Sequence, residues 1–444
     1  MSGHAGPGAT LTVRGSHPLG GAVRVPGDKS ISHRALLLGA LAEGRSGIVG
    51  LSDGEDVART AAAVRALGAR VDPEGVDGGA SRLHAPDGPV DAGNSGTTMR
   101  LFAGLVAGWP WTVTIGGDAS LCSRPMDRIA LPLRAMGAQV HGRGERDLPP
   151  IEVRGGALVG IDYTPPMASA QVKSCVLLAG LRADGTTVVR EAVPTRAHTE
   201  ELLARAGADV TVGEEGGARV VRLRRSALAP FALEVPGDPS QAAFWVVAAT
   251  VVAGSEVTVE GVYVGATRRG FVDVLRRMGA DIVERPAPGA DPTMPVADLV
   301  VRSAALTGTE VEAAEVTGLD EIPVLAVAAA RAEGTTVFRG VGELRVKESD
   351  RLAGVVGLLG AFGARAHAEG DDLVVTGVPR LAAGTVDARG DHRMAMAGAV
   401  AGLAAEAATG ETVVTGFDAV ATSYPAFAAH LRVLAGLGED EVGA

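Results

Sequence analysis

A long internal repeat constrains the fold of this sequence more than any other feature. An apolar residue followed by Gly-Ala and a short strand-like stretch recurs every 69 to 84 residues, at Gly68, Gly137, Gly207, Gly279, Gly363 and, in weaker form, Gly438. Between these markers lie apolar segments that end in glycine and lead into Thr/Val-rich stretches, as in SCVLLAGLRADGTTVV and VLAVAAARAEGTTVFRG. Glycine commonly ends helices and β-branched residues favour strands. The sequence therefore predicts six copies of a strand–helix–strand–helix–strand unit.

A second, larger duplication divides the six copies into two sets of three. The segment VPGDKS begins at Val25 and the similar segment VPGDPS begins at Val235. We therefore expect two similar α/β domains, the first of residues 26–234 and the second of residues 1–25 plus 235–444. The N-terminal LTVRG would supply a strand to the second domain. A single solenoid is the alternative, but units of about 70 residues exceed the usual solenoid period of about 20–50 residues.

Composition excludes several classes of protein. Hydrophobic residues make up 46% of the 444 residues, enough for packed cores, while the net charge of −11 and the 3% of aromatic residues disfavour nucleic-acid and membrane-surface partners. Only two cysteines are present, MSGHAGPGAT lacks the pattern of a secretion signal, and apolar runs such as FWVVAATVVAG fall short of the ~18 residues of a membrane helix. We expect a cytoplasmic protein with no nucleic-acid or membrane partner.

Lysine and asparagine are unusually rare. Of 41 basic residues only Lys29, Lys173 and Lys347 are lysines, and Asn94 is the single asparagine. A GC-rich genome explains the scarcity but not where the remaining residues stand. Arginine replaces lysine on most surfaces, but not where a compact ammonium or a transferable proton is needed. These four residues are therefore candidate functional residues.

Polar and charged residues gather at one phase of the repeat, where the opening strand leads into its helix. The turns concerned are Pro26–Arg34, Gly93–Thr98, Ala168–Gln171, Leu319–Pro323 and Gly390–Arg393. Helix N-termini present unpaired N–H groups and a positive dipole end, so several of them together favour anion binding. Ordinary helix capping explains any single turn equally well. Five turns in phase, with further charges in Ser123–Met126, Thr195–His198 and Leu344–Arg351, favour a binding site.

Other familiar sites are missing from the sequence. It contains no GxxxxGK[ST] phosphate loop, no GxGxxG after the first strand and no His/Cys spacing typical of zinc. Cys122 has no evident histidine partner and is interpreted as an ordinary thiol. We expect neither a metal nor an organic cofactor.

Eight segments together resemble the 5-enolpyruvylshikimate-3-phosphate synthase family. They are PGDKSISHRALLLGAL, DAGNSGTTMR, GDASLCSRPM, MASAQVKS, TRAHTEELL, DEIPVLAVAAA, LRVKESDR and DHRMAMAGA. They stand in order along the chain, and the resemblance as a whole runs from about residue 11 to residue 436. The resemblance implies an α/β fold of two domains, each with three βαβαββ units around a pseudo-threefold axis, and an active site in the interdomain cleft. It also implies a monomer that transfers the enolpyruvyl group of phosphoenolpyruvate to the 5-hydroxyl of 3-phosphoshikimate, without a cofactor, in aromatic amino-acid synthesis.

The resemblance also assigns roles to residues. The expected catalytic residues are Lys29, Asp320 and Glu348. The residues expected to bind 3-phosphoshikimate are Lys29, Ser30, Arg34, Ser169, Ala170, Gln171, Arg196, Asp320 and Lys347. The residues expected to bind phosphoenolpyruvate are Lys29, Asn94, Gly96, Arg124, Gln171, Arg351, His392 and Arg393.

Two departures and three alternatives accompany this resemblance. The lysine that some members carry just before their C-terminal Thr/Ser-aromatic-Pro segment is missing near Thr422. Gly96 stands where certain glyphosate-tolerant members carry alanine, so we expect glyphosate to compete with phosphoenolpyruvate. The alternatives are a paralogue acting on a related acceptor, the sister enolpyruvyl transferase of UDP-N-acetylglucosamine, and a catalytically inactive binding protein of the same fold.

Overall fold

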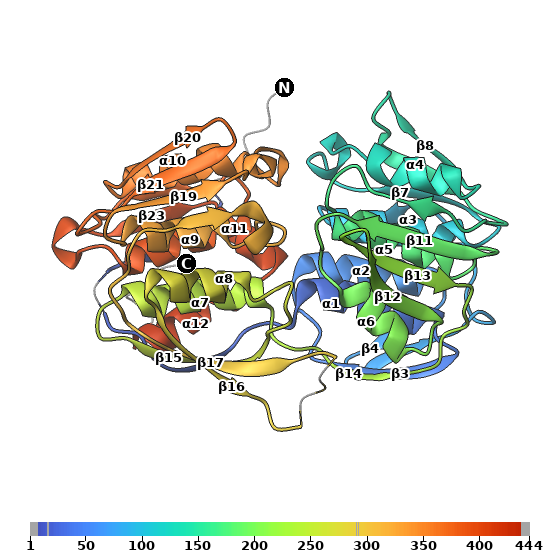
Figure 1. The fold of residues 1–444 in the computed structure, drawn as a ribbon, viewed down its shortest axis with the longest axis horizontal. Helices are drawn as coiled ribbons and strands as arrows, with labels where there is room; N and C mark the ends of the chain where they lie inside the picture. Colours follow the sequence, from blue (N-terminus) through green and yellow to red (C-terminus); the bar gives the residue numbers. More distant parts are fainter. Residues whose placement is uncertain (1–7, 16, 290, 292, 437–444) are drawn as a thin grey trace. The chain divides into compact units, whose positions relative to one another are not determined.

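The computed structural model describes residues 8–15, 17–289, 291 and 293–436, so the weak sixth marker Gly438 lies outside the described residues. The chain forms two compact units, which we name the continuous unit (Gly27–Val235) and the split unit (Met1–Pro26 and Pro236–Ala444). The sequence placed both divisions one residue earlier. Figure 1 colours the continuous unit from blue to green, and most of the split unit from yellow-green to red.

The continuous unit alternates strands and helices throughout. Its helices are α1 (Lys29–Leu41), α2 (Glu55–Ala66), α3 (Gly96–Ala107), α4 (Asp127–Ala135), α5 (Ala170–Gly180) and α6 (His198–Arg205). Its strands are β3 (Gly44–Val49), β4 (Arg70–Asp72), β5 (Gly75–Gly78), β6 (Val90–Asp91), β7 (Thr112–Gly116), β8 (Gln139–Arg143), β9 (Leu148–Arg154), β10 (Asp162–Tyr163), β11 (Thr186–Glu191), β12 (Val210–Glu215), β13 (Ala218–Arg224) and β14 (Ala232–Glu234).

The split unit repeats this order. Its helices are α7 (Pro239–Val251), α8 (Gly270–Met278), α9 (Ile322–Ala330), α10 (Arg351–Ala361), α11 (His392–Leu403) and α12 (Phe427–Ala435). Its strands are β1 (Thr10–Val13), β2 (Gly20–Arg24), β15 (Glu256–Tyr263), β16 (Asp281–Pro286), β17 (Val296–Arg302), β18 (Glu310–Glu312), β19 (Thr335–Arg339), β20 (Arg365–Glu369), β21 (Asp372–Thr376), β22 (Thr385–Asp387) and β23 (Thr412–Thr415). Short 3₁₀ turns lie between these elements, including Leu121–Ser123 and Gly342–Val346.

The sheets follow one plan, which confirms the predicted α/β fold of repeated units. In the order β6-β7-β9-β8, β6 runs parallel to β7, and β9 runs antiparallel to both β7 and β8. The sheets β10-β11-β13-β12, β14-β3-β5-β4, β16-β17-β15-β2 and β18-β19-β21-β20 share this pattern, and β1-β23-β22 is a shorter version. Where the chain passes from one unit to the other, the opening strands are exchanged, since β2 joins β15 and β14 joins β3. The bounds predicted from the sequence already assign residues 20–24 and 232–234 to these units, but the two strand pairings were not predicted.

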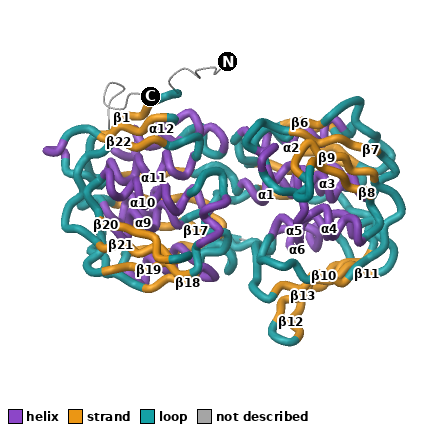
Figure 2. Tube along the Cα trace, turned by 90° about the horizontal axis from the view of Figure 1, so that it is seen from above, coloured by secondary structure: helices purple, strands orange, loops and turns teal. Residues whose placement is uncertain are grey.

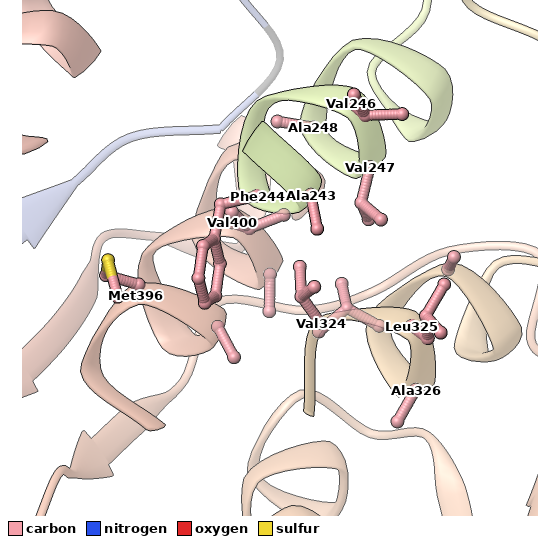
Figure 3. Close-up of a cluster of buried hydrophobic side chains, with 14 of the residues drawn as sticks. Ala243, Phe244, Val246, Val247, Ala248, Val324, Leu325, Ala326, Met396 and Val400 are labelled. Carbon is pink, nitrogen blue, oxygen red and sulfur yellow. The ribbon is translucent and has the colours of Figure 1, made fainter. Parts of the chain in front are cut away.

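The helices that follow the opening strands form the cores. In the split unit α7, α9 and α11 contact one another and are buried on almost every side, and Figure 3 shows Phe244, Val324 and Val400 of this cluster. A helix that is apolar all round belongs in a protein interior. Figure 2 shows the helices of each unit lying inside its strands. In the continuous unit, a Cβ on Gly104 of α3 would lie 2.3 Å from the Cys175 carbonyl oxygen of α5, so only glycine allows this close packing. None of the helices in the described ranges combines the length and apolar character that crossing a membrane requires.

Candidate functional site

Lys29 stands at the beginning of α1, the first buried helix of the continuous unit. Asp28 caps this helix, because its Oδ1 accepts a hydrogen bond of 2.8 Å from the Ile31 backbone N–H. The Lys29 ammonium lies 2.9 Å from Oδ2 of Asp56, in the first turn of α2, and the two side chains are only 18% and 12% exposed. Asp56 therefore fixes the lysine at a helix N-terminus, where the dipole favours anions.

Arg34, one turn further along α1, is buried and bound only to neutral oxygens among the described residues. Its Nε donates to Thr199 Oγ1 at 2.7 Å, Nη1 to the Ser30 carbonyl at 2.8 Å, and Nη2 to Ser174 Oγ at 2.7 Å. Burial, and then the charge of Arg196, lower the pKa of Arg34 to about 10. Arg196 itself donates to Ser30 Oγ at 2.9 Å. A buried guanidinium hydrogen-bonded to no carboxylate is a favourable place for a substrate anion.

Asn94, Gly96 and Arg124 lie together around the beginning of α3. Asn94 donates through Nδ2 to Asp118 at 2.7 Å and accepts through Oδ1 from Arg124 Nη2 at 2.7 Å. Arg124 also donates to Ser120 Oγ at 3.1 Å, so its described side-chain hydrogen bonds, like those of Arg34, go to neutral groups. A Cβ on Gly96 would lie 3.6 Å from Arg124 Nη1, which places the bare backbone of the helix start beside this guanidinium.

Gln171 connects the beginning of α5 to α3. The helix is capped by Ser169, whose Oγ accepts from the Val172 N–H, and Ala170 is its first residue. Gln171 Oε1 accepts from Arg100 Nη1 at 2.7 Å, and Nε2 donates to Thr97 Oγ1 at 2.9 Å. The predicted residues of α3 and α5 are thus joined through Arg100.

A cavity of about 440 Å³ opens beside these helix starts, a volume suited to a small ligand. Its lining residues are Glu55, Asp56, Arg59, Asp91, Gly93, Asn94, Gly117 and Asp118. Four of these are carboxylates and one is basic, so an anion in this region depends on the neighbouring Lys29 and Arg124. Within the described parts of the chain, no three His, Cys, Asp or Glu side chains are grouped closely enough to hold a metal ion.

His33 lies in the interior below these helix starts. Its Nδ1 is 2.6 Å from Thr60 Oγ1 on α2, and Thr60 in turn is 2.7 Å from Thr98 Oγ1 on α3. Burial lowers the pKa of His33 well below its ordinary value, helped by the charges of Lys29 and Arg34. The imidazole is therefore neutral at pH 7, and its chain of hydrogen bonds joins α1, α2 and α3.

In the split unit, Arg351 is the centre of a buried ion cluster at the beginning of α10. Its Nε lies 2.8 Å from Asp391 Oδ2, Nη1 lies 3.2 Å from Asp320 Oδ1, and Nη2 lies 2.6 Å from Glu348 Oε2. Against the effect of burial, these carboxylates raise the pKa of Arg351, and Arg351 lowers the pKa of Asp391. The cluster brings together two predicted catalytic residues, Asp320 and Glu348.

The backbone turns around this cluster are unusual. Leu319 has φ +60°, a left-handed conformation that non-glycine residues rarely adopt, and it directly precedes Asp320. Arg393 donates through Nη1 to the Asp320 carbonyl at 3.3 Å, and Lys347 donates to the Gly318 carbonyl at 3.0 Å. The predicted residues of this unit therefore gather around the 318–320 turn, with His392 at the beginning of α11. Non-glycine residues in rare conformations are often found at functional sites.

The structure thus places the predicted site residues in two groups, one in each unit, and their roles stay predictions. Asp56 and Arg100 were not assigned from the sequence. Asp56 lies in the first turn of α2, outside the turns that the sequence singled out, and Arg100 belongs to the quoted segment DAGNSGTTMR. Asp391 was noted only as a turn residue, whereas it holds Arg351 and caps α11. The turn Gly390–Arg393, singled out in the sequence, was a sufficient signal for Asp391, whereas no such signal marked Asp56.

Comparisons with known proteins agree on one family. The sequence model of EPSP synthase (3-phosphoshikimate 1-carboxyvinyltransferase) matches residues 13–431. The chain is similar to two proteins named 3-phosphoshikimate 1-carboxyvinyltransferase. The one from Sphingopyxis alaskensis is 48% identical, and the match covers 95% of this chain and 97% of the relative. The one from Methylobacterium sp. (strain 4-46) is 50% identical, and the match covers 96% of this chain and 97% of the relative. A solved structure of EPSP synthase from Acinetobacter baumannii superposes with a TM-score of 0.84 at 38% identity, covering 96% of this chain and 98% of that one.

Proposed function

Because this chain belongs to the EPSP synthase family, we propose that it transfers the carboxyvinyl group of phosphoenolpyruvate to the 5-hydroxyl of 3-phosphoshikimate and releases phosphate. The observation that carries the proposal within the structure is the pair Arg34 and Arg124. Both guanidiniums are held by neutral oxygens, in a protein whose net charge is −11. Two arginines arranged in this way fit two anionic substrates.

The proposed binding of 3-phosphoshikimate uses the cluster around Arg34. Arg34 and Arg196 both donate to Ser30, to its carbonyl and its hydroxyl oxygen respectively. Ser169, Ala170 and Gln171 supply the beginning of α5. Guanidinium groups bind carboxylates and phosphates through two parallel hydrogen bonds. Lys29, Asp320 and Lys347 complete the proposed set.

The proposed binding of phosphoenolpyruvate uses the beginning of α3. Gly96 leaves the helix N-terminus open beside Arg124, and Lys29 and Asn94 add an ammonium and an amide. In the split unit, Arg351, His392 and Arg393 are the proposed contacts. Arg351 is fully buried and touches three carboxylates, so it binds a substrate anion only when one carboxylate gives up its contact.

Glu348 is the carboxylate that we expect to be exchanged. Its side chain is 29% exposed, whereas that of Asp391 is fully buried, so Glu348 is the carboxylate of the cluster that can move towards solvent most easily. Binding of the phosphoenolpyruvate anion to Arg351 would then release Glu348 next to the substrate. Once released, Glu348 can take up a proton from solvent and then act as the proton donor for carbon 3.

The proposed reaction is an addition followed by an elimination. Asp320 accepts the proton of the 5-hydroxyl as its oxygen attacks carbon 2 of phosphoenolpyruvate, and Glu348 protonates carbon 3. In the second step carbon 3 returns a proton, the bond between carbon 2 and the phosphate oxygen breaks, and phosphate leaves beside Lys29. Positioned acids and bases of this kind each contribute about 10²–10⁴-fold. We further propose a monomer in the cytoplasm, where Cys122 and Cys175, both free thiols, would stay reduced.

The decisive test is phosphate release with both substrates and with each omitted. Release that requires phosphoenolpyruvate and 3-phosphoshikimate together is the expected result. Release with UDP-N-acetylglucosamine or with another shikimate-like acceptor, but not with 3-phosphoshikimate, would contradict the proposal. Binding without turnover would indicate an inactive member of the family.

A further inference from the structure

Lys173 has no role in the proposed reaction, yet it is one of three lysines and its side chain is completely buried. The ammonium lies 2.8 Å from Glu191 Oε2 and 2.9 Å from Glu200 Oε1. Lys173 belongs to α5, Glu191 is the last residue of β11 and Glu200 lies in the first turn of α6. One side chain therefore joins three elements.

The charges of this cluster balance. Two carboxylates face one ammonium, and Arg219 of β13, 3.3 Å from Glu200 Oε1, supplies the second positive charge. Glu191 and Glu200 are 3% and 2% exposed, so loss of the ammonium would leave two buried carboxylates with one cation. Apolar residues of similar volume often stabilise a fold as well as a buried ion cluster does. Stability alone therefore does not account for this cluster.

A second link runs in parallel between the same helices. Ser174, the residue after Lys173, and Thr199, the residue before Glu200, lie 2.7 Å apart through their hydroxyl oxygens. Both hydroxyls accept from Arg34. The ion pair of Lys173 and Glu200 fixes the register of α5 against α6. This register therefore also determines the positions of the two hydroxyl oxygens that orient the Arg34 guanidinium.

The cluster also holds the segment that carries Arg196. Thr195 donates its hydroxyl hydrogen to Glu191 Oε1, and Glu200 lies in the first turn of the helix on the other side of Arg196. Carboxylates bound to Lys173 thus flank the segment 192–199 at both ends. Arg196 extends from it to Ser30 Oγ at 2.9 Å.

We propose that Lys173 is a positioning residue for the first substrate, because its buried ammonium fixes the Arg196 segment and the α5–α6 register that orients Arg34. This inference rests on the proposed function and identifies the ligand as an anion bound by Arg34 and Arg196, here 3-phosphoshikimate. The phosphoenolpyruvate residues Asn94 and Arg124 are held by other contacts and do not depend on Lys173.

The test compares three variants with the wild type by calorimetric titration of 3-phosphoshikimate and by steady-state kinetics. Lys173→Met keeps the length of the side chain and removes its charge. We expect its Kd for 3-phosphoshikimate to rise about tenfold, with the KM of phosphoenolpyruvate changed less than threefold. Thr195→Val removes only the hydroxyl that binds Glu191, and we expect its Kd for 3-phosphoshikimate to rise at least threefold. It keeps the test decisive if Lys173→Met does not fold.

The control is Arg134→Met, which removes an ion pair of the same unit. Arg134 Nη2 lies 2.6 Å from Asp147 Oδ1, and its described hydrogen bonds go to Asp147 and Val140, which are not predicted substrate-binding residues. Its Kd should equal that of the wild type. A folded Lys173→Met with a Kd changed less than threefold, an equal rise in both substrate constants, or an equal loss in Arg134→Met would overturn the positioning role. Wild-type protein that does not bind 3-phosphoshikimate would instead refute the proposed function itself.

Discussion

Alanine at position 96 tests the proposed phosphoenolpyruvate site most directly. A Cβ on Gly96 would lie 2.7 Å from Arg100 Nη1, closer than side-chain carbons approach other atoms, and 3.6 Å from Arg124 Nη1, an ordinary contact. Arg100 must therefore move, and Nη1 is the atom that donates to Gln171 Oε1 at 2.7 Å. We expect the methyl group to displace this guanidinium and to weaken its hydrogen bond to Gln171.

The magnitude follows from the bond that is lost. A hydrogen bond to a charged group contributes about 1.5–3 kcal/mol, which corresponds to a factor of about 10–100. We expect Gly96→Ala to lower kcat/KM for phosphoenolpyruvate by this factor at saturating 3-phosphoshikimate. The matched control is Gly357→Ala in α10, where a Cβ meets nothing within 4 Å. It should leave the kinetics unchanged and stabilise the helix by up to about 1 kcal/mol.

A double-mutant cycle identifies the route of the effect. If the methyl group acts by displacing Arg100, then adding Gly96→Ala to Arg100→Met should cost less than threefold, because the displaced group is already gone. A full tenfold loss in that background, or a single variant within twofold of the wild type, would refute the argument.

The same variant tests the expected competition by glyphosate. An extra methyl group beside Arg124 should hinder the longer inhibitor more than phosphoenolpyruvate, and overpacking typically costs about 1–3 kcal/mol. The inhibition constant should therefore rise by more than the KM does. Equal changes in the two constants, or inhibition that excess phosphoenolpyruvate does not relieve, would show that the second substrate is wrongly placed.

Three further predictions concern charge. Lys29→Arg should lower kcat/KM more than tenfold, about 1.4 kcal/mol, since a guanidinium is bulkier and does not release a proton; a smaller loss would argue against the role of this lysine. Asp391→Asn should lower the free energy of unfolding by about 1.5–3 kcal/mol in urea titrations, because it weakens the charged hydrogen bonds to Arg351 while Asp320 and Glu348 remain, and an unchanged midpoint would contradict this. Burial, and then the charge of Lys29, lower the pKa of His33. As pH falls through the ordinary histidine value of 6.5, the unfolded chain therefore takes up a proton that the native protein does not. The free energy of unfolding then drops by up to about 1.4 kcal/mol per pH unit. His33→Asn, which keeps a polar partner for Thr60, should flatten this decline below pH 6.5, and an identical decline would exclude His33 as its source.

The repeat was predictable because its signals are local. The marker glycines Gly68, Gly137, Gly207, Gly279 and Gly363 all have positive φ, between 77° and 108°, at the turn that ends a helix. Such a conformation selects glycine at each copy, whatever the rest of the chain does. The segments VPGDKS and VPGDPS mark where the chain crosses between units, but the pairings of β2 with β15 and of β14 with β3 have no such local signal.

The candidate site was predictable in its helix-start residues but not in their partners. Lys29 stands out by composition, whereas Asp56 is separated from it by 27 residues and resembles any other carboxylate in a helix's first turn. The link from Arg100 to Gln171 spans 71 residues. Pairings of this kind are created by the packing of α1, α2, α3 and α5, and a single sequence contains no periodic signal for them.

The same packing separates arginines that contact carboxylates from arginines that are hydrogen-bonded to neutral oxygens, and this difference affects where an acidic protein can bind anions. Arg351 shares its charge with three carboxylates, so an anion must compete with a neighbour for it. Arg34 and Arg124 meet hydroxyl, carbonyl and amide oxygens, which orient a guanidinium and leave its charge in place. The first arrangement couples binding to the movement of an acid, as the exchange of Glu348 requires, and the second gives affinity at once. An enzyme that must bind one anion firmly and then protonate another needs both kinds of arginine.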